Sequence, residues 1–276
     1  MAFDLLADDA FHQGLNQSIL LAALVMARII PMVQLLPFLG GQAVPQTVKM
    51  ALALTLSLLI YPAIWTQGVA FELPDSTLTI TALLLKELAV GATFGFLLAL
   101  AFEALRMAGQ IIDNTAGLTQ ATTMVPQLSD RISPTSNFLY QLGVVVFFLI
   151  GGHHLFLMAL GQSFLLIPPH EFITLGADPS ALALHILRMT AEAIALACLM
   201  AFPVIAAITL TNLCLALVNK SAPQINVFFL GMPLKAVLAS AIVLLSMDAL
   251  IAAFSDRVLH DLDDLIVFFH LLRGEP

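Results

Sequence analysis

The fold is decided by the stretch ALALHILRMTAEAIALACLMAFPVIAAITLTNLCLALV, residues Ala181–Val218. Arg188 and Glu192 are its only Asp, Glu, Lys or Arg residues. A helix needs about 20 mainly apolar residues to cross the hydrocarbon core of a bilayer. The stretch is therefore long enough for a tilted spanning helix with extra turns, or for a hairpin of two helices broken at Pro203.

The rest of the chain has the same apolar character. Of its 276 residues, 60% are hydrophobic and 10% are charged, and the mean hydropathy is +1.00. A soluble domain of this composition would expose large apolar surfaces, so the chain is associated with a membrane. The formal net charge is -8 and the basic residues are scattered singly, which argues against nucleic acid as a partner.

Six apolar runs predict an all-α integral membrane protein with about six long helical segments, in one membrane-embedded domain covering residues 1–276. The predicted runs are Ser18–Leu39, Lys49–Trp65, Leu78–Leu105, Ser136–Ile167, Ala181–Val218 and Leu234–Phe254. They group into N-terminal helices (18–105), C-terminal helices (136–254) and a tail (255–276). The Gly151-Gly152 pair predicts a break in the fourth run.

Charge in the connections predicts a topology. Three connections carry basic residues, at Lys49, at Arg106 with Arg131, and at Lys220 with Lys235. The positive-inside rule places these connections in the cytoplasm and the N-terminus outside. No Lys or Arg precedes the first apolar run, which is unlike the basic start of a signal peptide, so we expect no cleaved leader.

Two connections are too apolar for ordinary loops. Residues 106–135 mix apolar and small polar side chains, which predicts a non-helical segment that covers helix ends, or one that lines or closes a pore. Residues 219–235 read NKSAPQINVFFLGMPLK. Pro223 and Pro233 should prevent one continuous helix, so we predict a re-entrant hairpin there that is buried against protein.

Few residues suggest chemistry. Gly91 and Gly95 have the spacing that lets two helices approach closely. Arg188 and Glu192 are four residues apart and should meet on one helix face, as a structural ion pair, a subunit contact or part of a proton relay. Neither the histidines nor the glycine-containing stretches match a metal or phosphate motif, so we expect no metal, no cofactor and no enzymatic activity.

At the hairpin the sequence resembles the FliR/SctT family of type III protein-export apparatus proteins. The resemblance rests on a pattern of Ala-Pro-Gln-x-Asn-Val-Phe followed by Gly-x-Pro-Leu-Lys. Its positions here are Ala222, Pro223, Gln224, Asn226, Val227, Phe228, Gly231, Pro233, Leu234 and Lys235. Similar pieces precede it in the family's order, among them Arg28-Ile-Ile-Pro31, Lys86-Glu87 with Gly91 and Gly95, and Ala108-Gly109-Gln110. The likeness covers about residues 18–255.

The resemblance implies a non-enzymatic subunit of the export gate in the bacterial inner membrane, which helps to form and seal a conduit for unfolded proteins. It implies lipid contact and partners similar to FliP/SctR, FliQ/SctS and FlhB/SctU. It also implies a plug from the long loop, carried over to Gln110, Ile111, Ile112, Asp113, Asn114, Gly117, Leu118, Thr119 and Met124. The hairpin from Pro223 to Lys235 would lie at the cytoplasmic entrance of the gate.

Between the two branches of the family, Ile112-Asp113-Asn114 resembles the injectisome side and Asn226-Val227-Phe228 the flagellar side. We expect the injectisome, with the flagellum as the alternative. Two other functions are open on the residues alone. A self-contained transporter of a small solute would use Arg188, Glu192 or Asp248 for coupling, and an intramembrane protease would use Ser163.

Overall fold

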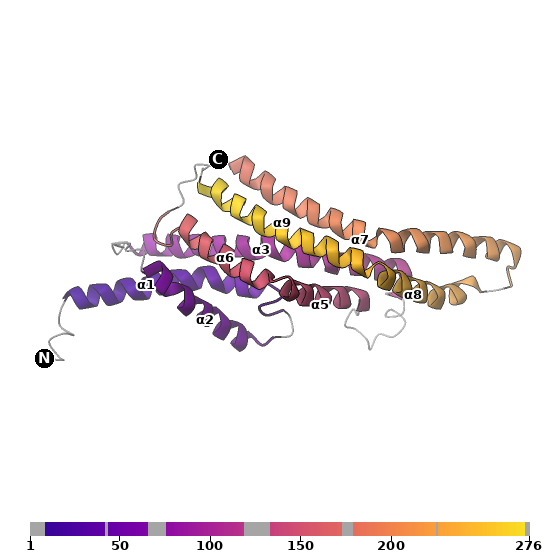
Figure 1. Cartoon of the computed structure of the whole chain (residues 1–276), viewed down its shortest axis with the longest axis horizontal. Helices are drawn as coiled ribbons and strands as arrows, with labels where there is room; N and C mark the ends of the chain where they lie inside the picture. Colours follow the sequence, from indigo (N-terminus) through magenta and orange to yellow (C-terminus); the bar gives the residue numbers. More distant parts are fainter. Residues whose placement is uncertain are drawn as a thin grey trace. The chain divides into compact units, whose positions relative to one another are not determined.

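The computed structural model describes residues 9–41, 44–65, 76–118, 133–172, 179–224 and 226–273. Throughout these residues the regular structure is helical, which confirms the all-α prediction (Figure 1). The helices are α1 (Asp9–Leu35), α2 (Gln46–Trp65), α3 (Thr77–Ala116), α5 (Pro134–Leu149), α6 (Gly152–Leu166), α7 (Pro179–Ser221), α8 (Val227–Leu245) and α9 (Met247–Arg273).

Five of these helices are long and apolar enough to cross a membrane: α1, α2, α3, α7 and α8. The broken pair α5 and α6 would make a sixth span if the two helices are counted together. The count agrees with the six predicted runs. The chain is therefore a multi-pass membrane protein.

Two helices are longer than a bilayer requires. α3 has 40 residues and α7 has 43, which at 1.5 Å per residue gives about 60 Å or more for each. The hydrocarbon core of a membrane is only about 30 Å thick. Parts of both helices must therefore lie outside the hydrocarbon core or cross it at a steep tilt.

The predicted helix breaks have different outcomes. The fourth run is interrupted at Ile150 and Gly151, and Gly151 has a φ of 75° that glycine adopts without steric cost. The predicted break at Pro203 is wrong, because α7 is continuous through it. A proline removes one internal amide donor but does not end a helix whose flanking turns keep their bonds. The α7 ribbon changes direction part-way along (Figure 1).

The end of the chain differs from the expected run and tail. The run predicted over Leu234–Phe254 is divided at Ser246 between α8 and α9. The Ser246 hydroxyl donates to the carbonyl oxygen of Ile242 at 2.8 Å, a local bond that competes with the helix ladder. The residues expected to form a tail from 255 onward continue α9 to Arg273.

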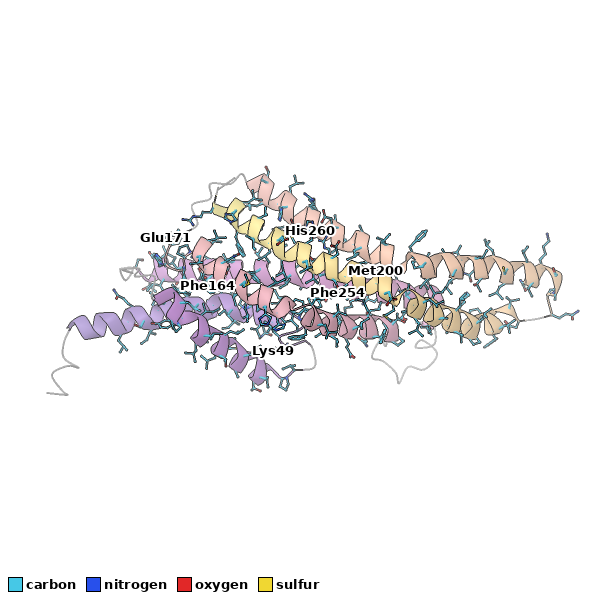
Figure 2. All side chains as sticks on the ribbon, in the orientation of Figure 1. Lys49, Phe164, Glu171, Met200, Phe254 and His260 are labelled. Atoms are coloured by element: carbon cyan, nitrogen blue, oxygen red, sulfur yellow. The ribbon has the colours of Figure 1, made fainter. Side chains whose placement is uncertain are left out.

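The helices form two compact units. Unit 1 comprises residues 1–99, 154–186 and 261–276, and unit 2 comprises residues 100–153 and 187–260. In unit 1, the buried Phe94 ring contacts Phe156 and Phe269, each with centroids 5.8 Å apart. In unit 2, the buried Phe102 ring contacts Phe147 and Phe254, with centroids 5.5 and 5.4 Å apart. Figure 2 labels Phe254 on α9.

Many apolar side chains remain outside these cores. On α8, Val237 is 70% exposed and Leu245 87%. On α7, Leu199 and Leu217 are 68% and 67% exposed. Apolar surface on this scale requires lipid or other proteins to cover it.

Candidate functional site

The long connection begins later than its sequence suggested. Gln110, Ile111, Ile112, Asp113 and Asn114 were predicted to be non-helical, but all five belong to the last turns of α3, which ends at Ala116. Gly117 then takes a φ of 79°, the left-handed conformation that commonly ends helices. Leu118 is the last described residue on this side, and two further predicted plug residues, Thr119 and Met124, lie outside the described part of the chain.

The two ends of this connection are held together at a site that we call the clasp, formed by Asp113, Thr135 and Ser136. The Asp113 side chain is fully buried. Its Oδ2 accepts hydrogen bonds from the backbone N–H of Thr135 at 3.2 Å and of Ser136 at 3.4 Å. These are amides of the first turn of α5, whose N-cap Ser133 makes no side-chain cap bond. A carboxylate from α3 therefore replaces the missing cap of α5.

Two further contacts fix the clasp. The Ser136 hydroxyl donates to the carbonyl oxygen of Arg106 at 2.9 Å. Gly109 lies so close to the Ser136 backbone that a Cβ at position 109 would overlap its Cα and N atoms. The glycine in Ala108-Gly109-Gln110 thus permits a contact between α3 and α5 that no larger residue allows.

The predicted hairpin is a tight turn between two helices. α7 ends at Ser221 and α8 begins at Val227, and Figure 1 shows the two helices joined by this short connection. Asn226 is the N-cap of α8, and its Oδ1 accepts from the backbone N–H of Phe229 at 3.5 Å. Pro223 lies in the turn, as expected of a residue that cannot continue a helix ladder.

Pro233 was predicted to be a second break, and this is wrong because it lies inside α8. Prolines are tolerated within apolar helices where neighbouring turns and helices compensate for the lost bond. The prediction that the hairpin is buried against protein is not met within this chain. Phe228, Phe229 and Leu230 are 54%, 62% and 53% exposed.

The end of α3 and the hairpin meet at a cavity of about 740 Å³, here called the amide cavity. It lies entirely in unit 2. The α3 end contributes Asn114, Thr115, Ala116 and Gly117; α7 contributes Asn212, Leu215, Ala216 and Asn219; the hairpin and α8 contribute Pro223, Gln224, Asn226, Val227, Phe228, Gly231, Met232 and Lys235. Residues from both predicted sites, far apart in sequence, therefore line one space.

The sequence comparisons agree with this architecture. The sequence profile of a protein family described as bacterial export proteins, family 1, matches residues 19–260. The chain belongs to this family. It is thus a membrane-embedded component of a bacterial type III export apparatus and not an enzyme.

Relatives of this export protein come from flagellar and secretion systems. The flagellar biosynthetic protein FliR of Caulobacter vibrioides is 28% identical over 242 residues, 88% of this chain and 94% of the relative. The Yop proteins translocation protein T of Yersinia pestis is 27% identical over 260 residues, 94% of this chain and 98% of the relative. The surface presentation of antigens protein SpaR of Salmonella typhimurium is 28% identical over 236 residues, 86% of each chain.

Unit 1 of the export protein contains a buried ion pair that its sequence did not predict. Arg28 and Glu87 are both fully buried. The Arg28 Nε donates to Glu87 Oε2 at 2.5 Å, and one of its terminal nitrogens donates to Oε1 at 2.9 Å. The remaining guanidinium donors reach the carbonyl oxygens of Ser163 and Ile167, each at 2.7 Å. α1, α3 and the end of α6 are thereby joined through one side chain.

Lys86 completes this buried cluster. Its Nζ lies 2.6 Å from Glu87 Oε1. It also donates to the carbonyl oxygens of Pro168, Pro169 and Glu171 at 2.9, 3.1 and 2.8 Å. These carbonyls follow the end of α6, where a cation is favoured by the helix dipole. Lys86 therefore holds the residues after α6, and Glu87 links it to Arg28.

Ser163 belongs to the same cluster, which argues against a nucleophile. It is fully buried, and its hydroxyl donates to the carbonyl oxygen of Leu160 at 2.7 Å. The ring centroid of Phe164, a residue labelled on α6 in Figure 2, lies 4.1 Å from the Arg28 guanidinium carbon. The Ser163 hydroxyl is thus engaged within α6, and the Ser163 carbonyl oxygen helps to place Arg28.

Gly91 and Gly95 lie where α1 crosses α3. A Cβ at Gly91 would overlap the carbonyl oxygen of Arg28, and one at Gly95 would lie 3.1 Å from the Cα of Met32. The two glycines thus allow α1 to approach α3 closely enough for the Arg28 side chain to reach Glu87.

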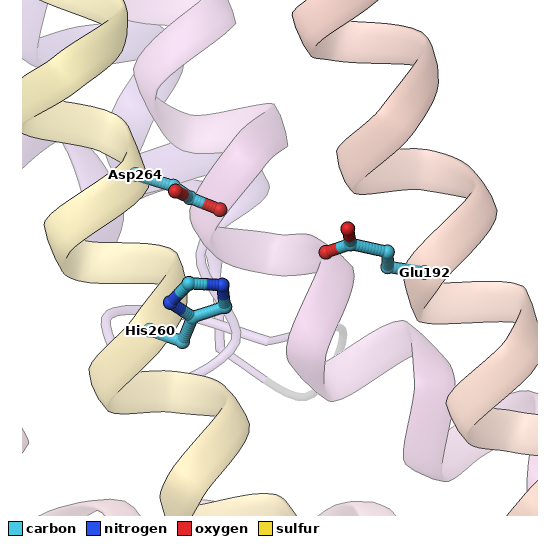
Figure 3. Close-up of side chains that lie close together, drawn as sticks. All are labelled: Glu192, His260 and Asp264. Atoms are coloured by element: carbon cyan, nitrogen blue, oxygen red, sulfur yellow. The ribbon is translucent and has the colours of Figure 1, made fainter.

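Arg188 and Glu192 form an ion pair in unit 2, at 2.8 Å. Glu192 has a second partner, Arg257 of α9, also at 2.8 Å. Arg257 is nearly buried, whereas Arg188 is 67% exposed. Figure 3 shows the Glu192 side chain pointing from α7 toward α9. His260 of α9 belongs to unit 2 with Glu192, whereas Asp264, which the figure also draws, belongs to unit 1. The pair therefore joins α7 to α9 through Glu192.

Proposed function

We propose that this export protein helps to form and seal the conduit through which unfolded proteins cross the bacterial inner membrane. The proposal covers an injectisome or a flagellar export gate, with the injectisome preferred from Ile112-Asp113-Asn114. Relatives with names that refer to protein translocation and flagellar biosynthesis support it. No phosphate-binding motif occurs in the sequence, so the energy for transport has to come from another component.

The observation that carries the proposal is the clasp. It holds the last turn of α3 against the first turn of α5, so both ends of the intervening connection start from a fixed base. A seal needs such a base, because a connection without one could not return to the same place after displacement. We propose that residues Gln110–Met124 supply the seal, with α3 holding its first part.

The hairpin gives a second part of the proposal. Its exposed residues Phe228, Phe229 and Leu230 offer an apolar surface beside the turn. Such a surface is suited to another membrane subunit. We propose that the turn lies at the cytoplasmic entrance, against a subunit similar to FlhB/SctU.

The long helices support a shared assembly. α3 and α7 each exceed the thickness of the hydrocarbon core, and exposed leucines run along α7. We propose that subunits similar to FliP/SctR and FliQ/SctS cover this surface together with lipid. On this basis the chain works only when assembled.

The seal is tested by shortening it. Deletion of a few residues between Gly117 and Met124 should make the assembled gate permeable to ions and small molecules. Membrane permeability is measured in cells, and co-purification with the neighbouring subunits shows that the gate has assembled. Normal permeability in cells that contain the assembled variant would refute the seal.

The hairpin is tested separately. Replacing Pro223 or Asn226 by alanine should lower export of a substrate protein more than it lowers the level of this chain, because the turn would lose its contact with a partner. Ser221→Ala is the matched control, since among the described residues the Ser221 hydroxyl bonds within α7, to the Leu217 carbonyl at 3.0 Å. Equal losses of export and protein level would mean that the turn serves folding alone.

A further inference from the structure

The amide cavity has an unusual set of lining groups for a chain that is so apolar. Five of its lining residues carry side-chain carboxamides: Asn114, Asn212, Asn219, Gln224 and Asn226. Each carboxamide presents two N–H donors and a carbonyl acceptor. Asn114, Asn212 and Asn219 are exposed in this chain, so their groups are available to a ligand.

The charge that the described lining residues give the cavity is positive. Among the described residues that line it, Lys235 is the only ionisable one. Lys235 is half-buried, and the described part of the chain offers it neither a hydrogen bond nor an ion-pair partner. No acidic residue occurs in the sequence between Glu192 and Asp248. A half-buried ammonium without a counterion favours an anionic ligand.

The shape and position of the cavity restrict that ligand. The cavity is bordered by Gly117, where the long connection begins, and by the exposed Phe228 on the hairpin. An extended peptide has alternating N–H and C=O groups, and carboxamides can pair with both kinds whatever the sequence. A phosphate group, in contrast, has only acceptor oxygens, so it would pair with the carboxamide N–H groups and leave the carboxamide oxygens to water.

We propose that the amide cavity binds an acidic segment of the exported polypeptide in an extended conformation. The carboxamides pair with its main chain, and Lys235 pairs with an aspartate or glutamate side chain. This inference rests on the proposed function, since it takes the ligand from the chain that passes through the gate. It adds a place where that chain is held, next to the start of the proposed seal.

The test uses the full chain in its detergent-solubilised membrane assembly. Short fluorescent peptides rich in Glu, Ser and Thr are titrated by fluorescence anisotropy, together with matched peptides in which Gln replaces every Glu. The acidic peptide should bind roughly tenfold more tightly, which is the effect of one hydrogen bond to a charged group. Lys235→Gln should remove this difference, and Lys235→Arg should keep it.

The matched control is Lys220→Gln, which removes a lysine of the same hairpin that does not line the cavity. It should leave both affinities unchanged. Asn212→Leu should weaken both peptides by the same factor, since it removes only main-chain pairing. Equal affinity of the wild-type assembly for the two peptides would overturn the proposal, and so would equal losses in the Lys220 and Lys235 variants.

A lipid headgroup is distinguished by adding vesicles of phosphatidylglycerol. If these bind the wild type but not Lys235→Gln, and neither peptide binds, the anion is a lipid phosphate and the proposal fails. The outcome of these binding measurements can be distinguished from the outcome of the permeability test of the seal. If the Gly117–Met124 deletion variant is leaky but the wild-type assembly binds neither peptide, this inference alone fails. If the acidic peptide binds as expected but the deletion variant stays impermeable, the seal alone fails.

Discussion

Removing the carboxylate of Asp113 should open the clasp without unfolding the rest of unit 2. In Asp113→Ala, the N–H groups of Thr135 and Ser136 lose their acceptor, and Ser133 does not replace it. Loss of an N-cap acceptor costs about 1 kcal/mol, within a range of about 0.5–2 kcal/mol. The upper part of that range, about 1–2 kcal/mol, corresponds to roughly a 5- to 30-fold change in a local opening equilibrium.

The assay is hydrogen exchange of the assembled protein, followed on the peptide that covers the first turns of α5. Exchange there should accelerate by that factor in Asp113→Ala, while the buried interior of α5 at Leu139 and Val146 keeps its protection. Asp113→Asn retains a carbonyl acceptor and should lie between the wild type and the alanine variant. Unchanged exchange in Asp113→Ala, or equal acceleration in both variants, would refute the clasp.

Gly109→Ala perturbs the same contact from the other side. Its Cβ would overlap the Ser136 backbone, which cannot move without drawing the start of α5 away from Asp113. The exchange signature should therefore match that of Asp113→Ala. Protection of the α5 start in Gly109→Ala would show that the two helices are held by other contacts.

Other predictions concern unit 1 and the surface, and each is measured by thermal unfolding of the assembled protein. Arg28→Leu should lower the free energy of unfolding by about 3–5 kcal/mol, because Glu87 is left buried without its main partner. The double variant with Glu87→Leu should recover part of that loss. A double variant less stable than the single one would contradict this. Gly91→Ala should destabilise through overlap with the Arg28 carbonyl, whereas Gly161→Ala, with nothing within 4 Å of its Cβ, should be neutral or stabilising. Arg188→Gln removes an exposed ion pair and should change stability by less than about 1 kcal/mol, so a larger loss would assign this side chain a structural role.

Local ion pairs could be predicted from the sequence, and distant ones could not. Arg188 and Glu192 are four residues apart, so helical periodicity alone brings them together. Arg28 and Glu87 are 59 residues apart, and their pairing depends on which face of α1 meets α3. Two opposite charges in separate apolar runs were a signal that they need partners, but only Gly91 and Gly95 indicated where another helix could approach α3.

The predicted loop shows the opposite error. Residues 109–116 contain Asp, Asn, Thr and Gly, whose intrinsic helix propensity is low, and a loop was the natural interpretation. The structure instead continues α3 through them, because Ala108, Ile112 and Ala116 recur at helical spacing and are all buried. Tertiary burial therefore outweighs propensity here, and the helix ends only where Gly117 takes a positive φ.

The clasp and the amide cavity place different demands on the same few turns of α3. Asp113 is buried and bonded to α5, whereas Asn114, the next residue, is exposed and lines the cavity. Neighbouring helical residues point about 100° apart, so one turn can hold α5 on one side and meet a ligand on the other. A chain held by Asn114 and Lys235 would thus contact the residues directly before Gly117 without competing for the clasp. Opening of the proposed seal would then begin beyond Gly117, and the clasp would keep the base in place for closure.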